Sequence, residues 1–188
     1  MNRVHQWICS SERWARVVSG VYLPWALAGV ELGDDVLEVG PGYGATTRVL
    51  VERARSLTAV EIDEALAQRL DRALGHRARI VHGDGTKMSF DTASFDTVTC
   101  FTMLHHVPSP TLQDRLFAEA FRVLKGGGIF AGADSLPGLV FSLLHIHDTM
   151  VLVDPKALPR RLEAVGFHDV EVTTQPGQAF KFRARKPS

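Results

Sequence analysis

Strand and helix signals alternate along most of this 188-residue chain, and this alternation restricts the fold more than any other feature of the sequence. Short runs of apolar and β-branched residues are separated by segments whose apolar residues recur at helical spacing. Strands separated by helices of about 10–15 residues are typical of parallel βαβ units. We expect strands at residues 35–39, 57–62, 78–82, 95–101, 129–133, 169–174 and 179–185, and helices at residues 45–53, 63–74, 111–124 and 154–165.

The last two expected strands are joined only by residues 175–178, which is room for a hairpin but not for a crossover helix. The sequence therefore predicts an α/β fold. Its sheet is Rossmann-like, doubly wound and seven-stranded, mostly parallel with one antiparallel strand near the C-terminus, and helices cover both faces. Apolar and basic residues alternate in residues 179–185, as in an edge strand. The glycines at 126–128 are expected to stop the preceding helix.

Composition and charge argue against several classes of protein. Lys+Arg and Asp+Glu balance at 21 each and the pI is about 7.1, so no net basic charge attracts nucleic acid. The two cysteines, Cys9 and Cys100, form no disulfide framework or zinc motif. The longest apolar stretch, residues 17–30, is shorter than the roughly 20 residues that span a bilayer. We expect a soluble, cytoplasmic protein without stable membrane insertion.

A glycine-rich loop directly follows the first expected strand, in the segment Glu38-Val-Gly-Pro-Gly-Tyr-Gly44. Gly40, Gly42 and Gly44 allow the backbone to approach a ligand closely and to adopt dihedral angles that other residues avoid. In an open α/β sheet, ligands bind at the carboxyl ends of the strands. The loop is therefore predicted to bind a cofactor.

The same loop satisfies the dinucleotide pattern G-x-G-x-x-A, with Ala45 in the last place. Glu38 argues against a dinucleotide, because its carboxylate would repel a pyrophosphate and instead suits a ligand with a cationic ammonium group. The expected terminal hairpin is not part of the plain dinucleotide-binding topology. Neither Tyr22 nor Tyr43 has a lysine four residues on, as an oxidoreductase with a Tyr-x-x-x-Lys pair would.

Two further acidic residues follow the next strands. Glu61 ends the second strand, at about the spacing from the glycine loop at which a carboxylate bonds both ribose hydroxyls. Asp63 is its competitor, but it begins a helix and is better placed as an N-cap. Asp84 follows the third strand in His82-Gly-Asp-Gly85 and could accept a hydrogen bond from an adenine amino group.

Taken in order, these motifs resemble a class I S-adenosylmethionine-dependent methyltransferase. Six segments carry the resemblance: the glycine loop (first motif), residues 60–63 (ribose site), 83–85 (adenine site), 94–107 (strand four), 121–128 (helix into strand five) and 162–170 (run into strand six). The resemblance covers residues 33 to about 185. The stretch Leu104-His-His-Val107 is most similar to the small-molecule, quinone-methyltransferase-like branch.

The resemblance implies S-adenosylmethionine as the cofactor and assigns its amino-acid end to the first motif. Glu38 would face the methionine amino group. Gly40, Gly42 and Gly44 would contact the methionine and ribose portions, with Tyr43 beside them.

The nucleoside end is assigned in the same way to the three following strands. The resemblance implies that Glu61 holds the ribose hydroxyls and that Ile62 flanks the adenine. Asp84 and the backbone of Gly85 would read the adenine edge. Phe101 would offer its carbonyl to the methionine amine.

Two differences from related families restrict the range of reactions that the sequence predicts. The region after residue 101 lacks the Asn/Asp-Pro-Pro-aromatic sequence of amino methyltransferases that act on nucleobases, which disfavours that substrate class. Cys100 could suggest a covalent pyrimidine mechanism, since a thiolate is the nucleophile there. No proline precedes Cys100, however, and it belongs to an apolar strand, where a buried thiol is inert.

Methyl transfer from a sulfonium is an in-line displacement in which the protein mainly aligns the acceptor, so a catalytic base is optional. His105 and His106 are candidates for removing a proton from a phenol or an amine, with ring packing as the alternative. His145 and His147, with Asp148, suggest a metal site only weakly, because no third ligand has the right spacing. No catalytic residue and no metal ligand is assigned.

The chain is predicted to be one methyltransferase domain over residues 1–188. Its expected parts are an N-terminal helical cap (1–30), a cofactor-binding core (33–134), a lid segment (136–153) and a C-terminal helix and hairpin (154–185). The basic residues near the end of the chain are expected to form a solvated strand face rather than a nucleic-acid patch: Lys181, Arg183, Arg185 and Lys186.

The cap and the lid segment are both apolar, which favours a small apolar or aromatic acceptor; a packed cap or a homodimer interface is the alternative. Trp7, Trp14 and Trp25 could serve any of these roles. The predicted function is S-adenosylmethionine-dependent methyl transfer to such a small molecule by in-line displacement. A methyltransferase acting on nucleic acid or protein, and a non-catalytic cofactor-binding module, are the alternatives.

Overall fold

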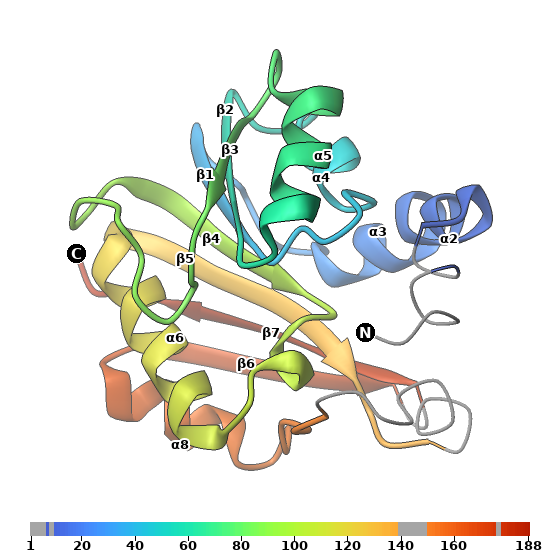
Figure 1. Cartoon of the computed structure of the whole chain (residues 1–188). Coiled ribbons are helices and arrows are strands. Elements are labelled where there is room, and N and C mark those ends of the chain that lie inside the picture. The colour runs from blue at the N-terminus through green and yellow to red at the C-terminus, as the bar shows by residue number, and fades with distance from the viewer. Residues whose placement is uncertain (1–6, 8–9, 139–149, 176–177) are drawn as a thin grey trace.

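A single seven-stranded sheet organises the chain, in the order β3-β2-β1-β4-β5-β7-β6 (Figure 1). The computed structural model describes residues 7, 10–138, 150–175 and 178–188. The strands are β1 (Asp35–Val39), β2 (Ser56–Glu61), β3 (Arg79–His82), β4 (Phe95–Phe101), β5 (Leu124–Ser135), β6 (His168–Gln175) and β7 (Ala179–Arg185). The first five run parallel, and β7 is antiparallel to both of its neighbours. The predicted fold class is confirmed.

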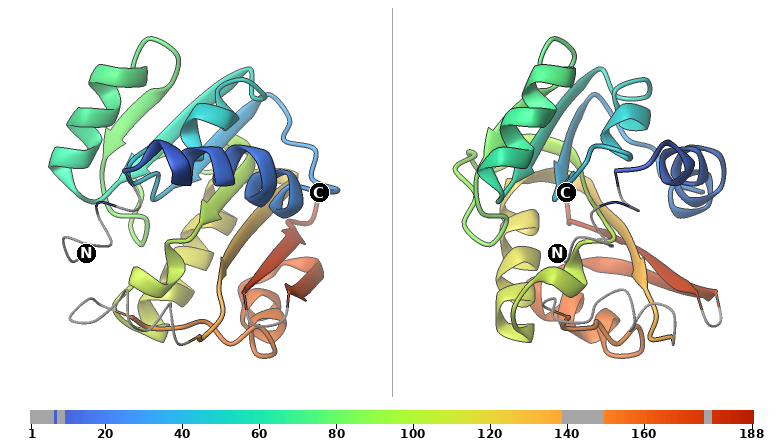
Figure 2. Two further views of the ribbon diagram at one scale, coloured as in Figure 1. Left: turned by 90° about the vertical axis from the view of Figure 1, so that its right-hand side faces the viewer. Right: turned by 45° about the vertical axis from the view of Figure 1, so that its right-hand side comes forward.

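Helices cover both faces of the sheet. The helices are α2 (Glu12–Val17), α3 (Leu23–Ala26), α4 (Thr47–Leu50), α5 (Glu64–Leu74), α6 (Pro110–Val123) and α8 (Leu158–Val165). Leucine and phenylalanine side chains of α6 and α8 pack on one face, around Phe130. On the other face, α3 and α4 pack over Val36 and Phe101, and Figure 2 shows the N-terminal helices lying across the sheet.

The longer helices begin where the sequence provides an N-cap. Asp63 accepts a hydrogen bond from the Leu66 N–H at the start of α5 (3.0 Å), as predicted for Asp63. Ser109 accepts one from the Leu112 N–H at the start of α6 (3.2 Å). The helix predicted at residues 45–53 is shorter than expected, because only Thr47–Leu50 is helical and turns flank it.

Two predictions about the C-terminal half are wrong. The glycines at 126–128 do not terminate α6, which already ends at Val123; β5 begins at the next residue and contains all three glycines. The segment Ala179–Arg185 is not an edge strand, since β7 lies between β5 and β6 and β6 is the edge. Two of its basic residues contact the N-terminal segment: Lys181 donates to the Trp25 carbonyl (2.9 Å) and Arg183 to the Gly29 carbonyl (2.7 Å).

The N-terminal segment contains a rare helical turn. Ser11 caps α2, and α2 continues into the π-helical turn η1 (Val18–Tyr22) and then into α3. The Leu23 N–H bonds to the Val18 carbonyl, five residues back. Such turns are frequent at functional sites. In the predicted lid, residues 139–149 lie outside the described residues, and His145, His147 and Asp148 are among them.

Candidate cofactor site

The glycine loop between β1 and α4 needs glycine at each of its three predicted positions. Gly40, Gly42 and Gly44 have φ angles of 70°, 54° and 79°, in the left-handed region that side chains disfavour. A Cβ on Gly44 would lie 2.4 Å from the Leu70 Cδ1, so this end of the loop is closely packed. A Cβ on Gly42 would meet nothing within 4 Å. The loop is therefore packed at its end and open at its centre.

Glu38 is buried at the end of β1, with 1% of its surface exposed. The Thr46 hydroxyl donates to its Oε1, whereas Oε2 has no hydrogen-bond partner in the described part of the chain. Burial raises the pKa of Glu38 to about 7; the neighbouring hydroxyls of Thr46 and Thr47 oppose the increase, and the charge of Glu61 adds to it. A buried carboxylate with an unpaired oxygen suits a cationic ligand group.

Glu61, at the end of β2, is held by the backbone on either side of it. Its Oε2 accepts from the Gly42 N–H (2.9 Å) and its Oε1 accepts from the Asp63 N–H (3.0 Å). A carboxylate has about four lone-pair directions, so two are left for further donors such as ribose hydroxyls. The side chain is thus fixed in place and ties the glycine loop to β2.

The predicted adenine contacts gather at the ends of β2 and β3. Ile62 is 68% exposed, unusually high for a large apolar residue, and presents an apolar surface next to Glu61. Asp84 uses Oδ1 to accept from the Thr86 N–H and hydroxyl (2.8 Å each), which fixes the turn after β3. A Cβ on Gly85 would lie 2.7 Å from the Val39 Cγ1, so only glycine fits there.

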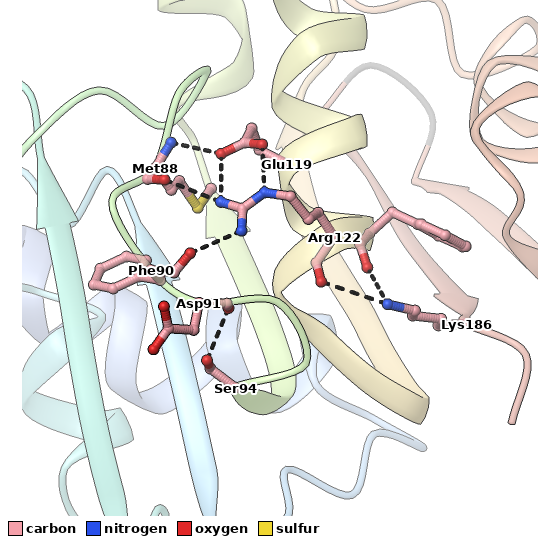
Figure 3. Close-up of polar contacts among 8 residues, drawn as sticks. Met88, Phe90, Asp91, Ser94, Glu119, Arg122 and Lys186 are labelled. Atoms are coloured by element: carbon pink, nitrogen blue, oxygen red, sulfur yellow. Dashed lines mark hydrogen bonds and ion pairs between the residues drawn. The ribbon is translucent and has the colours of Figure 1, made fainter.

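A clamp that the sequence analysis missed holds the loop that follows this turn (Figure 3). Arg122 of α6 donates to the carbonyls of Phe90 (2.7 Å) and Met88 (3.0 Å). Glu119 accepts from the Met88 N–H (2.6 Å) and also pairs with Arg122 (2.7 Å). Arg122 lies inside the motif at residues 121–128, which marks it as a residue of interest. The carbonyls to which it donates belong to residues about 30 positions earlier, so the sequence does not indicate the contact.

Tyr43 and Phe101 are the two remaining residues that the sequence predicts to contact the cofactor. Tyr43, in the glycine loop, has the Arg69 guanidinium 5.2 Å from its ring centroid. Phe101 ends β4, and its carbonyl already accepts from the Thr102 hydroxyl (2.8 Å). Thr102 has a φ of 52°, so the chain turns sharply at the carboxyl end of β4.

The carboxyl ends of β1, β2, β3 and β4 therefore bring all ten predicted cofactor residues to one edge of the sheet. There the chain presents the buried carboxylate of Glu38, the fixed carboxylate of Glu61 and the exposed apolar side chain of Ile62. These features fit a ligand with an ammonium group, a ribose and an aromatic base.

Comparison with known proteins identifies the family. The family described as a methyltransferase domain matches residues 37–132, which include the glycine loop, Glu61, Asp84 and Phe101. The chain belongs to the methyltransferase domain family. The predicted class, a class I S-adenosylmethionine-dependent methyltransferase, is confirmed, and with it the enzyme type and the cofactor.

The methyltransferase has both sequence relatives and structural neighbours. It is 37% identical over 95 residues to "Ribosomal RNA small subunit methyltransferase A" of Mycobacterium tuberculosis, a match that covers 46% of this chain and 30% of that protein. It is 35% identical over 98 residues to "Probable S-adenosylmethionine-dependent methyltransferase" of Mycolicibacterium smegmatis, covering 52% and 37%. The chain thus spans about a third of the length of these relatives.

A solved structure shares the fold over nearly the whole methyltransferase. A SAM-dependent methyltransferase from Archaeoglobus fulgidus superposes with a TM-score of 0.76 at 16% identity, covering 98% of this chain and 100% of that one. At this identity the likeness concerns the fold alone. Within the described residues, no helix is long and apolar enough to span a bilayer.

Proposed function

We propose that this chain transfers the methyl group of S-adenosylmethionine to a small apolar or aromatic acceptor by in-line displacement. The cofactor supplies an electrophilic methyl group on its sulfonium, and the protein aligns and shields it. Glu38, whose buried Oε2 has no described partner, would bind the methionine ammonium. Glu61 would accept from the ribose hydroxyls while it keeps its bonds to Gly42 and Asp63. This pair of acidic groups is the observation that carries the proposal.

The remaining predicted residues complete the cofactor site in the proposal. Gly40, Gly42, Tyr43 and Gly44 would contact the methionine and ribose, and Phe101 would contribute its carbonyl. Ile62, Asp84 and Gly85 would surround the adenine. Residues 1–188 would act as one domain, in which the N-terminal helices cover the acceptor.

The small acceptor is supported by the aromatic side chains of the N-terminal helices. Trp14, Tyr22 and Trp25 pack in the cluster that also contains Phe101 and Ala133 at the ends of β4 and β5. Tyr22 makes an edge contact with Phe101, with centroids 6.5 Å apart. An aromatic cover over the carboxyl ends of these strands suits an apolar or aromatic molecule better than a polyanion.

A ribosomal RNA acceptor is the second candidate, because relatives with that name match about half of the chain. The basic side chains of the terminal strand argue against it. Lys181 and Arg183 donate to the carbonyls of Trp25 and Gly29, and Lys186 donates to those at the end of α6. Cations bonded to the protein in this way are less available to phosphates. The expectation of a solvated basic face therefore holds for the exposed Arg185 but not for Lys181 and Lys186, which are partly buried and bonded to backbone carbonyls.

Thermal melting with S-adenosylhomocysteine tests the cofactor site. Ligand at 100 times its Kd should add about 2.7 kcal/mol, which corresponds to a Tm increase of roughly 5–10 °C for a domain of this size. NADH should cause no shift. A shift with NADH alone would contradict the proposal.

The substitution Glu61→Ala isolates the predicted ribose contact. We expect it to abolish the Tm shift by S-adenosylhomocysteine, since both the ribose acceptor and the tie to Gly42 are lost. Glu64→Ala, an exposed glutamate in the first turn of α5, is the matched control and should keep the shift. An unchanged shift in Glu61→Ala would place the ribose elsewhere.

Transfer of a tritiated methyl group distinguishes the two acceptors. Protein incubated with labelled S-adenosylmethionine and either 30S ribosomal subunits or a small-molecule extract should label only an organic-soluble product. Label in the RNA fraction would favour the second candidate.

A further inference from the structure

A tyrosine hydroxyl without a partner lies beneath the N-terminal helices. Tyr22 ends the π-helical turn η1, and its hydroxyl is buried with no hydrogen-bond partner in the described part of the chain. Leaving such a group unpaired is unfavourable unless a ligand supplies the partner. Burial raises the pKa of Tyr22 well above its usual value, and the charge of Asp134 raises it further. The hydroxyl therefore stays protonated and can donate.

A buried histidine–aspartate pair lies at the same end of the sheet. His105 follows β4 and Asp134 lies near the end of β5, with 2% and 1% of their surfaces exposed. The His105 Nδ1 lies 2.5 Å from the Asp134 Oδ1. Asp134 Oδ2 accepts from the His105 backbone N–H (3.0 Å), so the carboxylate fixes both the ring and the backbone.

This pairing sets the tautomer of the imidazole. An ionised carboxylate only accepts hydrogen bonds, so Nδ1 carries the proton that is shared with Asp134. In the neutral ring Nε2 then has the lone pair and can accept a proton. Asp134 is a positioning residue, because it acts through His105.

The strand register places the two features at the same end of the sheet. Phe101 and Ala133 are partners in the β4–β5 pairing, and Asp134 is the next residue. The ring of Tyr22 lies against Phe101 at the carboxyl end of β4, and the charge of Asp134 contributes to the raised pKa of Tyr22. The Tyr22 ring and the His105–Asp134 pair thus both lie at the carboxyl ends of β4 and β5, near the predicted cofactor contact at Phe101.

We propose that Tyr22, His105 and Asp134 form the acceptor subsite and select a hydroxyl-bearing aromatic ring, so that the methylated atom is oxygen. This inference rests on the proposed function and specifies its acceptor. Tyr22 donates a hydrogen bond to the acceptor oxygen, and His105 receives the proton of that hydroxyl.

Oxygen fits this donor–acceptor pair better than nitrogen. A hydroxyl oxygen has two lone pairs, so it accepts a hydrogen bond from Tyr22 with one and attacks the methyl group with the other. A neutral amine has a single lone pair, which a bond from Tyr22 would occupy. The donor that assists a hydroxyl would therefore hinder an amine.

The step balances without a further reactant. The acceptor oxygen forms a bond to the methyl carbon as the carbon–sulfur bond breaks, and the electron pair of that bond remains on sulfur. The hydroxyl proton passes to the His105 Nε2, which gives an imidazolium beside Asp134. Burial of both side chains keeps water from competing for the proton.

Binding of matched ring compounds to protein saturated with S-adenosylhomocysteine tests the subsite. We expect 2-naphthol to bind at least about tenfold more tightly than 2-methoxynaphthalene, which lacks the proton, and than 2-naphthylamine. Tyr22→Phe and His105→Asn should each reduce this preference to less than about threefold. Val21→Ala, exposed on the same helical segment, and His76→Asn, an exposed histidine after α5, are the controls and should retain it.

Nitrogen NMR of labelled histidine separates a functional role of His105 from a structural one. In the wild type Nδ1 should carry the proton, and the Nε2 resonance should move on addition of 2-naphthol but not of 2-methoxynaphthalene. Asp134→Asn should keep the fold but weaken the response of the Nε2 resonance to 2-naphthol.

Several results would overturn the inference. These are equal binding of the three ring compounds, no binding of 2-naphthol, retention of the preference in Tyr22→Phe, or a proton on Nε2. If S-adenosylhomocysteine still raises the Tm in these cases, the proposed function stands and only the acceptor subsite fails. If it does not, the cofactor site itself is in error.

Discussion

In the half of the sheet formed by β1, β2 and β3, acidic side chains are fixed mainly by groups close in the sequence. Glu61 bonds to Gly42, 19 residues away, and Glu38 bonds to Thr46, eight residues away. In the half formed by β4, β5 and β7, the contacts are more distant. His105 and Asp134 are 29 residues apart, and Lys181 bonds to Trp25 across 156 residues.

This difference matches the role that we propose for each half, cofactor binding for the first and acceptor binding for the second. The proposed cofactor half consists of a glycine-rich turn and carboxylates at strand ends, which short sequence motifs can encode. The acceptor half is assembled from three distant segments, so its chemistry can change with the N-terminal helices while the cofactor half stays intact. Substitutions in the two halves should therefore have separable effects on cofactor affinity.

The largest expected effect concerns Glu38, which makes the free energy of unfolding depend on pH. Its pKa rises from 4.5 to about 7 in the folded chain. A raised acid pKa contributes stability that is fully present below pH 4.5 and is lost as the pH rises through about 7. This loss amounts to about 3 kcal/mol.

Glu38→Gln should remove that dependence. At pH 8 the variant without ligand should be more stable than the wild type by up to about 3 kcal/mol, yet S-adenosylhomocysteine should stabilise it less. Urea unfolding at pH 5 and pH 8, with and without ligand, measures both effects. Parallel pH profiles for the two proteins would contradict the expectation.

Arg122→Met should have the next largest effect, because it leaves the carbonyls of Phe90 and Met88 without their donor. We expect a loss of about 2–3 kcal/mol, since hydrogen bonds to charged groups are the stronger ones. Cofactor affinity should also fall, because the clamp holds the loop after Asp84. Arg77→Met, at an exposed ion pair, should leave the Tm unchanged. Unaltered affinity in Arg122→Met would show that the loop needs no clamp.

Lys181→Met tests the independence of the acceptor half. It removes the bond to the Trp25 carbonyl and the contact with the Trp25 ring at 5.6 Å. We expect a loss of about 1 kcal/mol with no change in affinity for S-adenosylhomocysteine, measured by calorimetry. A matching loss of affinity would show that the N-terminal helices support the cofactor half as well.

The smallest effect is expected at Cys100. Burial raises the pKa of this thiol well above its usual value, and the charge of Asp134 adds to the increase. In a Cys9→Ser background, iodoacetamide at pH 8 should modify Cys100 only after unfolding. Rapid labelling of the folded protein would show that β4 opens at its carboxyl end.

The sequence allowed prediction of the cofactor half because its determinants are local. Positive φ angles require Gly40, Gly42 and Gly44, and the alternation of strands and helices brings Glu61 and Asp84 to the same edge. The interior position of β7 was not predictable from its basic residues. Alternating charges resemble those of an exposed strand, and only the folded structure reveals that Lys181 faces a carbonyl.

The proposed acceptor subsite is also assembled from residues that are far apart in the sequence. The sequence predicts His105 as a candidate base, but nothing near His105 in the sequence indicates Asp134, which belongs to a different strand. The sequence around Tyr22 shows only that no lysine follows it four residues on. Its unpaired hydroxyl becomes visible only when the N-terminal helices are placed on Phe101.

The π-helical turn Val18–Tyr22 has a consequence for how the acceptor half could change. Each residue of an α-helix advances the side chains by about 100° around the axis, and a π-turn accommodates one additional residue in the turn. Deleting Gly20 would restore α-helical winding and change the rotational phase between α2 and α3. Tyr22 would then point away from Phe101, or α2 would have to rotate on the sheet. The orientation of this hydroxyl is thus encoded by the number of residues in the turn as well as by their identity, and a one-residue insertion or deletion could redirect specificity in a single step.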